Sequence, residues 1–356
     1  MPMRLTRTLS VVVVVMCALA APLSAQLGQL GKAKSALDKG QKATDAINSL
    51  IFTDAEEQQL GQQVSDKLRV RYGVVQDKAV HKYVTLVGSV LAQASSRPAL
   101  PWKFIVLDTD GVNAYAAPGG FIHITRGALS LLQNESELAG MLGHEIAHVT
   151  EKHTIDAIRK SNGEKILTDL GGSATRTQIL GAFADKLYEN VFQGVYDRGD
   201  ELDADDKGSA VANKAGYAPG GLGAFLTRLD ERNKDQPERN GLFASHPDTK
   251  ERIDKLAKGI TARKLSSAAI VAGRYKASIT YKPVPVTQVA QVADSKLGMS
   301  TQAAIGSEKK SSSTVASAGA RGGVPDRDAK GGSNPAIVIV TVTKAEIAEF
   351  IKGIAG

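Results

Sequence analysis

Residues 134–150 read NESELAGMLGHEIAHVT, and this stretch holds the most informative motif of the chain. Asn134 is a good N-cap and Glu137 can complete a capping box, so a helix is predicted to begin here. Side chains four residues apart share one face of a helix, which places His144 beside His148. The apolar residues predicted to bury the other wall of this helix are Leu138, Met141, Leu142 and Val149.

The pentapeptide His144–His148 (HEIAH) has the H-E-x-x-H spacing of zinc peptidases. Two imidazoles so placed can close on one metal ion, and Glu145 is then carried beside that ion, where it can take a proton from water. Histidine is scarce, with 6 in 356 residues, so a chance match has odds of roughly one in a few hundred. One Zn²⁺ per chain is the predicted cofactor.

Two histidines alone would hold zinc loosely, so a third ligand is expected. The best candidate is Glu201, within the acid-rich segment Asp197–Asp205 (DRGDELDAD). On a helix Glu201 and Asp205 share a face, so Glu201 would bind the metal while Asp205 could hydrogen-bond the outer nitrogen of a liganding histidine. The alternative is that this segment is only an exposed acidic helix face.

The first 25 residues have the layout of a secretory signal peptide. Arg4 and Arg7 form a basic start, and an apolar run covers 11–21. Pro22 ends this run just before small residues, and cleavage is expected after Ala25. The run is short for a membrane anchor, although an uncleaved signal anchor stays open. The mature chain is therefore expected to be exported and periplasmic, either soluble or peripheral to the envelope.

The cysteine content and the net charge give little support to a disulfide-stabilised fold or to a nucleic-acid-binding protein. The single cysteine, Cys17, lies in the signal segment, so the mature chain would form no disulfide. Met16 stands before it, where a lipoprotein signal would have a small residue, so no lipid attachment is expected. The net charge of +7 falls to +5 without Arg4 and Arg7, and it is spread along the chain with no basic block. Nucleic-acid binding therefore gets little support. Peripheral membrane association and the oligomeric state stay open.

Four ordered motifs make the chain similar to the HtpX and CAAX prenyl protease family of zinc metalloendopeptidases, the gluzincins. The likeness covers roughly residues 50–260. Without later membrane spans, the chain is most similar to the soluble periplasmic, BepA-like branch. The residues that carry the likeness are Asn113-Ala114-Tyr115-Ala116-x-Pro118-Gly119-Gly120, His144-Glu145-x-x-His148, Arg198 before Glu201-x-x-Ala204-Asp205, and Ser245-His246-Pro247 with Arg252.

The resemblance implies an α+β, mostly helical, zincin-like metallopeptidase domain with a short mixed sheet and an HExxH active-site helix. The β-rich stretch Trp102–Leu107 and two short strands around Pro118–Gly120 would supply the sheet. In such folds an edge strand pairs with extended substrate, and here that strand would be Gly120–Thr125. The predicted substrate-binding residues are Asn113, Ala114, Tyr115, Gly120, Phe121, Ile122 and His123.

The resemblance also places His246 near the metal, as a second catalytic residue besides Glu145. His246 could hydrogen-bond the oxyanion, occupy the open position of zinc and hold the enzyme off, or only cap the helix that Pro247 opens. Arg198 is expected to order the site through a carboxylate, with Asp205 as the candidate. His153 stands five residues after His148, so it is expected to point off the metal face and lie at the surface.

The chain divides into segments by composition and periodicity. Beyond the catalytic domain, β-like alternation over Ala269–Tyr281 suggests a small hairpin, and Ile337–Val340 reads as a strand before a short helix. The predicted segments are a signal peptide (1–25), a leader or loosely docked helix (26–52), the zinc metallopeptidase domain (53–262), a small β-like extension (263–299), a low-complexity linker (300–335) and a short strand-helix tail (336–356).

Two functions follow as hypotheses. The first is a zinc metalloendopeptidase that uses metal-activated water with Glu145 as general base, in quality control of unfolded or misassembled cell-envelope polypeptides. The second is a normally closed, metal-stabilised chaperone or binding module with gated protease activity. His246 and the glycine-containing segment 161–195, expected to be a mobile helical excursion over the site, motivate the second.

Overall fold

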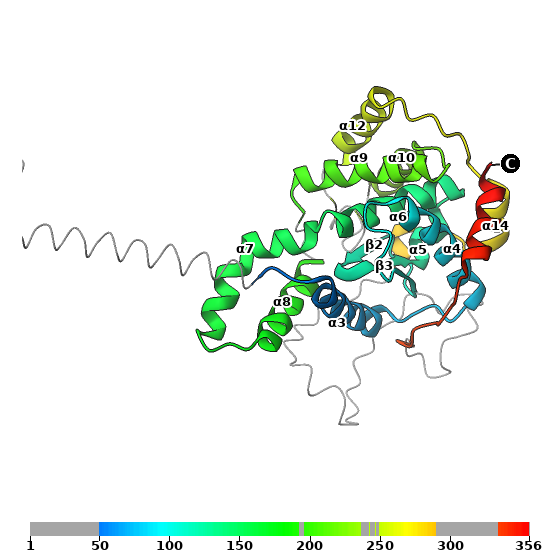
Figure 1. Ribbon diagram of the computed structural model, residues 1–356. Coiled ribbons are helices and arrows are strands. Elements are labelled where there is room, and N and C mark those ends of the chain that lie inside the picture. Colours follow the sequence, from blue (N-terminus) through cyan, green and yellow to red (C-terminus); the bar gives the residue numbers. More distant parts are fainter. Residues whose placement is uncertain are drawn as a thin grey trace, which may run out of the picture. The chain divides into compact units, whose positions relative to one another are not determined.

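The computed structural model describes residues 50–191, 196–235, 242, 246, 249–289 and 334–355. The compact unit that begins at Phe52 is mostly helical and holds one small mixed sheet, which confirms the predicted α+β class (Figure 1). The predicted signal peptide, most of the leader and nearly all of the linker lie outside the described residues.

Side-chain caps fix where several helices begin. Thr53 Oγ1 accepts from the backbone N–H of Glu56, whose carboxylate accepts from the N–H of Thr53, and Asp77 and Asp197 cap α4 and α9. The helices are α3 (Asp54–Tyr72), α4 (Lys78–Ala94), α5 (Arg126–Leu131), α6 (Glu135–Thr150), α7 (His153–Leu170), α8 (Arg176–Val191), α9 (Arg198–Lys214), α10 (Gly221–Asn233), α12 (Thr249–Ala262), α13 (Ala272–Ser278) and α14 (Lys344–Ala355).

The sheet has three strands in the order β1-β3-β2. β3 (Phe121–Thr125) pairs in parallel with β1 (Lys103–Leu107) and antiparallel with β2 (Ala114–Ala117). The turn between β2 and β3 requires glycine, because Gly119 has a φ of 71° and a Cβ there would lie 2.5 Å from Gln58 Cα. The two strands around the Pro-Gly-Gly turn are therefore present as predicted.

The predicted role of Gly120–Thr125 as an edge strand is wrong. β3 is the central strand, so both of its hydrogen-bonding edges are already used by β1 and β2. Among the described residues, no strand pairs with the outer edge of β2. β2 is therefore the outer strand on this side of the sheet. A substrate strand cannot pair with β3.

α6 forms the centre of the molecule. Asn134 caps it as predicted, with its side-chain oxygen 3.0 Å from the backbone nitrogen of Glu137. Every residue from Glu135 to Val149 is buried, because α4, α9, α10 and the sheet surround the helix (Figure 1). The wall that carries the histidines is thus covered as well, by α9.

α6 and α9 cross with their backbones in contact. A Cβ on Gly143 would lie 2.8 Å from the carbonyl oxygen of Gly208, and a Cβ on Gly208 would lie 2.7 Å from the nitrogen of His144. Glycine at both positions lets the helices approach closely. This crossing brings the acidic side chains of α9 to the histidines of α6.

The segment predicted as a mobile excursion forms α7 and α8, which are helices as expected. α8 packs on α3, and the ring of Phe183 meets that of Phe52 edge-on with centroids 4.7 Å apart. Phe183 and Leu187 are fully buried, so the segment contributes to the packed structure. None of the helices in the described part of the chain has the length and apolar character needed to cross a bilayer.

The predicted hairpin over Ala269–Tyr281 is wrong, because Ala272–Ser278 forms the helix α13. Tyr275 and Ile279 are both buried, and their spacing of four residues suits one helix face as well as a strand. The apolar pattern of this short stretch is thus compatible with a helix, which is the form it takes. A hydrogen bond of 2.6 Å from Tyr275 Oη to the carbonyl oxygen of Leu129 attaches α13 to the rest of the unit.

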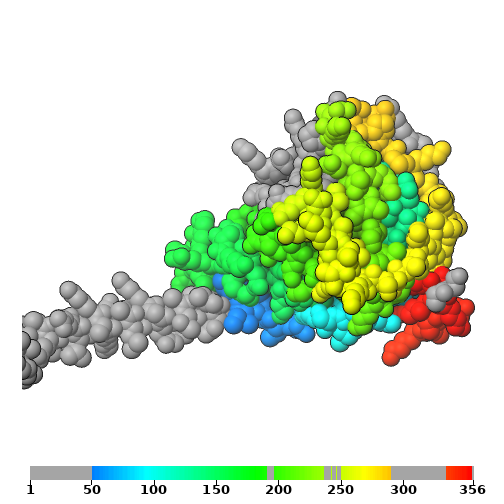
Figure 2. All heavy atoms as spheres, turned by 90° about the horizontal axis from the view of Figure 1, so that it is seen from above, coloured from blue at the N-terminus to red at the C-terminus, as the bar shows by residue number. Residues whose placement is uncertain are grey.

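The tail ends in the predicted helix, α14, but the strand predicted over Ile337–Val340 is wrong, because these residues form no regular element. Lys82 of α4 lies 2.6 Å from the Glu346 carboxylate, and the guanidinium of Arg274 stands 3.8 Å from the ring centroid of Phe350. The tail (red in Figure 2) is thereby attached to α4 and α13.

Candidate metal centre

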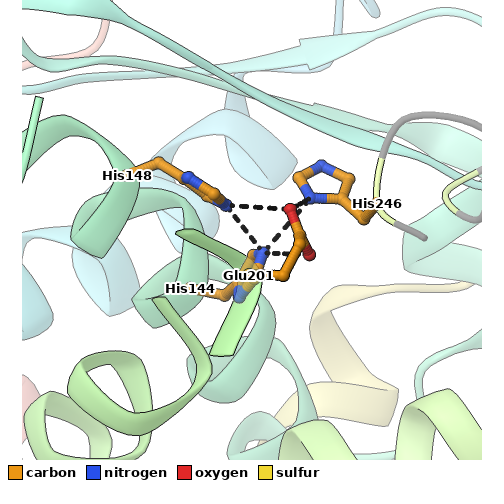
Figure 3. Close-up of side chains that lie close together, drawn as sticks. All are labelled: His144, His148, Glu201 and His246. Carbon is orange, nitrogen blue, oxygen red and sulfur yellow. Dashed lines mark hydrogen bonds and ion pairs between the residues drawn. The ribbon is translucent and has the colours of Figure 1, made fainter. Parts of the chain in front are cut away.

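Four buried side chains from three parts of the chain point their donor atoms at one spot (Figure 3). His144 and His148 come from α6, Glu201 from α9 and His246 from the segment before α12, and these atoms lie within 4.8 Å of one another. The two histidine Nε2 atoms are 3.0 Å apart, and they lie 3.6 Å and 3.5 Å from the oxygens of Glu201. The structure therefore brings the three predicted ligands together.

The spacing of these atoms fits a tetrahedral metal ion. With ligand bonds of 2.0–2.1 Å, the ligand atoms of a tetrahedral zinc ion lie about 3.3 Å apart. His246 Nδ1 completes the set, at 3.3 Å from His144 Nε2 and 2.9 Å from Glu201 Oε1. Imidazole nitrogens and a carboxylate suit a divalent transition metal such as zinc. The group can hold one metal ion, with His246 at the fourth corner.

At His148 and Glu201, electrostatics favour the protonation states that a metal requires. Burial lowers the pKa of His148 well below its ordinary value, so the ring stays neutral. Burial alone would raise the pKa of Glu201, but the charges of His246 and Arg252 hold it well below the usual range. A neutral imidazole and an ionised carboxylate are the forms that bind metal.

Asp205 makes the contact predicted for it, since its Oδ1 lies 2.9 Å from His144 Nδ1. Arg252 of α12 pairs with Asp205 through Nε and Nη2 at 2.8 Å and 2.7 Å, and with Glu201 through Nη1 at 2.7 Å. Burial raises and the Arg252 hydrogen bonds lower the pKa of Asp205, with a lowered pKa as the net result. The buried guanidinium of Arg252 thus holds the carboxylates of both Asp205 and Glu201 in place.

The prediction that Arg198 orders the site is wrong. Arg198 is 59% exposed in its side chain and pairs with Glu251 at the surface. The residue that performs this task is Arg252, which is 1% exposed. Arg198 stands three residues before Glu201 in the sequence, whereas Arg252 follows Asp205 by 47 residues and reaches it through the packing of α12 against α9.

Glu145 differs from the other carboxylates of the site. It is fully buried, and neither of its oxygens has a hydrogen-bond partner among the described residues. Its Oε1 lies 3.8 Å from His246 Nε2. Burial raises the pKa of Glu145 above its ordinary value. A carboxylate so placed can accept a proton from a water molecule between it and the donor cluster.

Two residues beside the cluster were not predicted as part of it. Tyr196 stacks on the ring of His148 with centroids 3.8 Å apart, and its hydroxyl lies 2.8 Å from Thr154 Oγ1. His153 Nδ1 lies 3.1 Å from His148 Nδ1. Tyr196 lies directly before Asp197, the N-cap of α9, and no sequence motif marks it. The prediction that His153 lies at the surface is wrong, since it is buried.

The residues predicted to bind substrate all lie in or next to the sheet, with their side chains buried. His123 points away from the donor cluster toward α3, with its Nε2 2.9 Å from Ser65 Oγ, and Tyr115 Oη lies 3.2 Å from Tyr72 Oη. These side chains are therefore part of the packed interior in this structure. The predicted residues that the structure buries are Asn113, Ala114, Tyr115, Gly120, Phe121, Ile122 and His123.

Comparison with known proteins finds proteins named as metalloproteases among the relatives of this chain. A putative beta-barrel assembly-enhancing protease of Vibrio cholerae serotype O1 is 28% identical over 194 residues, 52% of this chain and 40% of that protein. Metalloprotease YcaL of Escherichia coli (strain K12) is 28% identical over 166 residues, 45% of this chain and 64% of that protein. Mitochondrial metalloendopeptidase OMA1 of Schizosaccharomyces pombe is 25% identical over 174 residues, 49% of this chain and 51% of that protein.

The chain spans less than two thirds of the length of each of these relatives. Residues 78–260 match peptidase family M48, and this stretch contains all four residues of the donor cluster. The chain therefore belongs to peptidase family M48, a family of metallopeptidases.

Proposed function

We propose that this protein is a zinc-dependent endopeptidase in which His144, His148 and Glu201 hold the metal and Glu145 is the general base. The observation that carries the proposal is the buried Glu145 carboxylate, free of hydrogen-bond partners among the described residues, next to converging metal-binding donors. A bound zinc ion would supply Lewis-acid activation of water and of the scissile carbonyl. The protein residues perform the proton transfers and the positioning.

Glu145 takes the proton of the attacking water and delivers it to the leaving amine. Its raised pKa brings the carboxyl closer to the operating pH, where one group can serve as base and then as acid. Asp205 and Arg252 hold His144 and Glu201 in place during this transfer.

The outer edge of β2 is the proposed docking edge for an extended substrate. Its backbone is unpaired by any other strand in the described residues, and β2 contacts α6, which carries the histidines. Main-chain pairing binds unfolded segments with little dependence on sequence. Unfolded or misassembled polypeptides of the cell envelope are therefore the proposed substrates, supported by the signal-peptide layout of residues 1–25 and by relatives named beta-barrel assembly-enhancing proteases.

The test replaces the general base. Glu145→Gln keeps the shape of the side chain and removes its basicity, so zinc binding should persist while kcat on unfolded casein falls about 10²- to 10⁴-fold. Glu189→Gln on the exposed face of α8 is the control and should retain activity. Zinc content by atomic absorption accompanies the kinetics. Full activity of zinc-loaded Glu145→Gln would exclude the mechanism.

A second candidate, the normally closed and gated protease, is favoured by the position of His246. Its Nδ1 lies among the ligand atoms, where substrate oxygen and water need to bind. We propose that His246 holds the site closed.

His246→Ala distinguishes the roles left open for this residue. If His246 closes the site, the variant should cleave casein faster and bind zinc more weakly, because one donor is lost. A variant with normal zinc affinity and slower cleavage would instead assign His246 to oxyanion stabilisation. The comparison needs initial rates at saturating zinc together with a zinc titration by chelator competition.

A further inference from the structure

His153 is the first residue of α7, and its ring stands against the back of His148. The two Nδ1 atoms are 3.1 Å apart, and the rings meet edge-on at an angle of 77°. On the other side, His153 Nε2 lies 3.2 Å from Asp203 Oδ2. Lys207 Nζ lies 2.9 Å from that same oxygen. A chain of polar contacts thus runs from α9 through His153 to a residue of the donor cluster.

A break in the helix puts His153 in this place. On a continuous helix a residue five positions after His148 would point about 140° away from it. Here α6 ends at Thr150, and Lys152 has left-handed backbone angles, φ 59° and ψ 25°. The chain therefore turns before α7 begins, and the side chain of His153 folds back onto His148.

The metal requirement fixes the protons along this chain. When His148 Nε2 offers its lone pair to a metal, the neutral ring carries its proton on Nδ1. Among the described residues, the acceptor in place for that N–H is His153 Nδ1, which must then present a lone pair and carry its own proton on Nε2. The Nε2–H of His153 donates in turn to the Asp203 carboxylate. One arrangement of protons satisfies every contact.

We propose that His153 is a positioning residue for the metal centre, which sets the tautomer and ring orientation of His148 and links it to the charge of Asp203. His144 is held directly by Asp205 at 2.9 Å, so the two histidines of the motif are fixed by different means. Partners of this kind typically contribute 10- to 100-fold to metal affinity or activity. The inference rests on the metal centre of the proposed peptidase.

The test compares two replacements of His153 in the full-length protein, with zinc affinity measured by competition with a chromophoric chelator in the absence of substrate. His153→Asn keeps an acceptor at the same number of bonds from the backbone as Nδ1. His153→Phe keeps the ring and loses the acceptor. Zinc affinity should fall about 10- to 100-fold in His153→Phe and fall clearly less in His153→Asn, which keeps the acceptor for His148 but loses the donor to Asp203.

Packing alone would give the opposite order, with His153→Phe close to wild type and His153→Asn impaired, and that result would overturn the proposal. Thermal unfolding of the metal-free variants checks that each one folds. If neither does, Asp203→Ala carries the test, and it should bind zinc more weakly than Asp206→Ala, which removes a neighbouring acid that pairs with Arg263. Equal affinities of these two variants would also contradict the proposal.

Failure of this inference and failure of the proposed function give different results. If wild-type protein bound no zinc and did not cleave casein, the proposed function would fail. If wild type bound zinc and cleaved casein while His153→Phe matched its zinc affinity, only the role of His153 would fail.

Discussion

His123 lies on the central strand β3 with no exposed side-chain surface, and its Nε2 is 2.9 Å from Ser65 Oγ. Burial lowers its pKa from the ordinary 6.5 to about 3. The folded protein therefore keeps this ring neutral at pH values where the unfolded chain protonates it. Acid should destabilise the protein through this single residue, away from the donor cluster.

His123→Gln tests this linkage. Below pH 6.5 the unfolded state binds one more proton at His123 than the folded state, so stability falls by about 1.4 kcal/mol per pH unit as the pH drops toward 3. Between pH 7 and pH 5 the wild type should thus lose about 2 kcal/mol more than His123→Gln does. Urea unfolding of both metal-free proteins at the two pH values measures the difference. Equal losses would mean that His123 is not neutral through burial.

At the scale of single residues, the sequence predicted whatever depends on spacing within one helix. His144 and His148 share a face, and so do Glu201 and Asp205, and the structure brings these four side chains together. Arg252 was named as a motif residue without a role, and His153 was misplaced, because the positions of both depend on packing and chain turns beyond one helix. Arg252 reaches the site through the packing of α12 on α9, and the break at Lys152 has no glycine or proline to mark it.

At the scale of elements, the crossing of α6 and α9 positions the donors. Gly143 and Gly208 let the backbones touch, so that Glu201 and Asp205 reach the two histidines of α6. A side chain at either glycine would push the helices apart. Stability and metal affinity should therefore change together at this crossing.

Gly208→Ala puts this coupling to the test. The added methyl would lie 2.7 Å from the backbone nitrogen of His144, which requires a shift of α9. Such overpacking typically costs about 1–3 kcal/mol, and the displaced Glu201 should weaken zinc binding as well. Gly223→Ala on α10 is the matched control, because nothing lies within 4 Å of its Cβ position. Urea unfolding and zinc titration that show no difference between the two variants would refute the coupling.

The elements themselves were predictable where caps and periodicity mark them. Asn134 and Pro118–Gly120 mark α6 and the β2–β3 turn correctly. The order of strands was not predictable, because β1 pairs with β3 across a gap in sequence that no local signal records. The helix α13 was mistaken for a hairpin because short apolar stretches fit both periods.

At the scale of the whole molecule, a buried carboxylate joins segments far apart in the chain. Glu135, the first residue of α6, accepts from Tyr83 Oη at 2.9 Å and Tyr217 Oη at 3.1 Å, and Arg274 Nη2 lies 2.6 Å from it. Arg274 also stacks on Phe350 of α14. The C-terminal helix is thus connected through one arginine to the start of the motif helix.

Phe350→Ala should show that the tail stabilises the domain. The variant loses the cation–π contact with Arg274 and ring contacts with Tyr83. Because Phe350 is only partly buried, a cost of about 1–3 kcal/mol is expected, below that of a fully buried phenylalanine. Ile351→Ala, 38% exposed on the same helix, should cost much less. Chemical unfolding compares the two, and equal stabilities would show that the tail is not coupled to the domain.

The central claim is that His144, His148 and Glu201 hold one zinc ion beside Glu145. A crystal structure of the zinc-loaded protein, with anomalous scattering recorded on both sides of the zinc edge, tests it most directly. One anomalous peak is expected within about 2.0–2.2 Å of both histidine Nε2 atoms and of a Glu201 oxygen. A peak at other residues, or none between these three side chains, would contradict it.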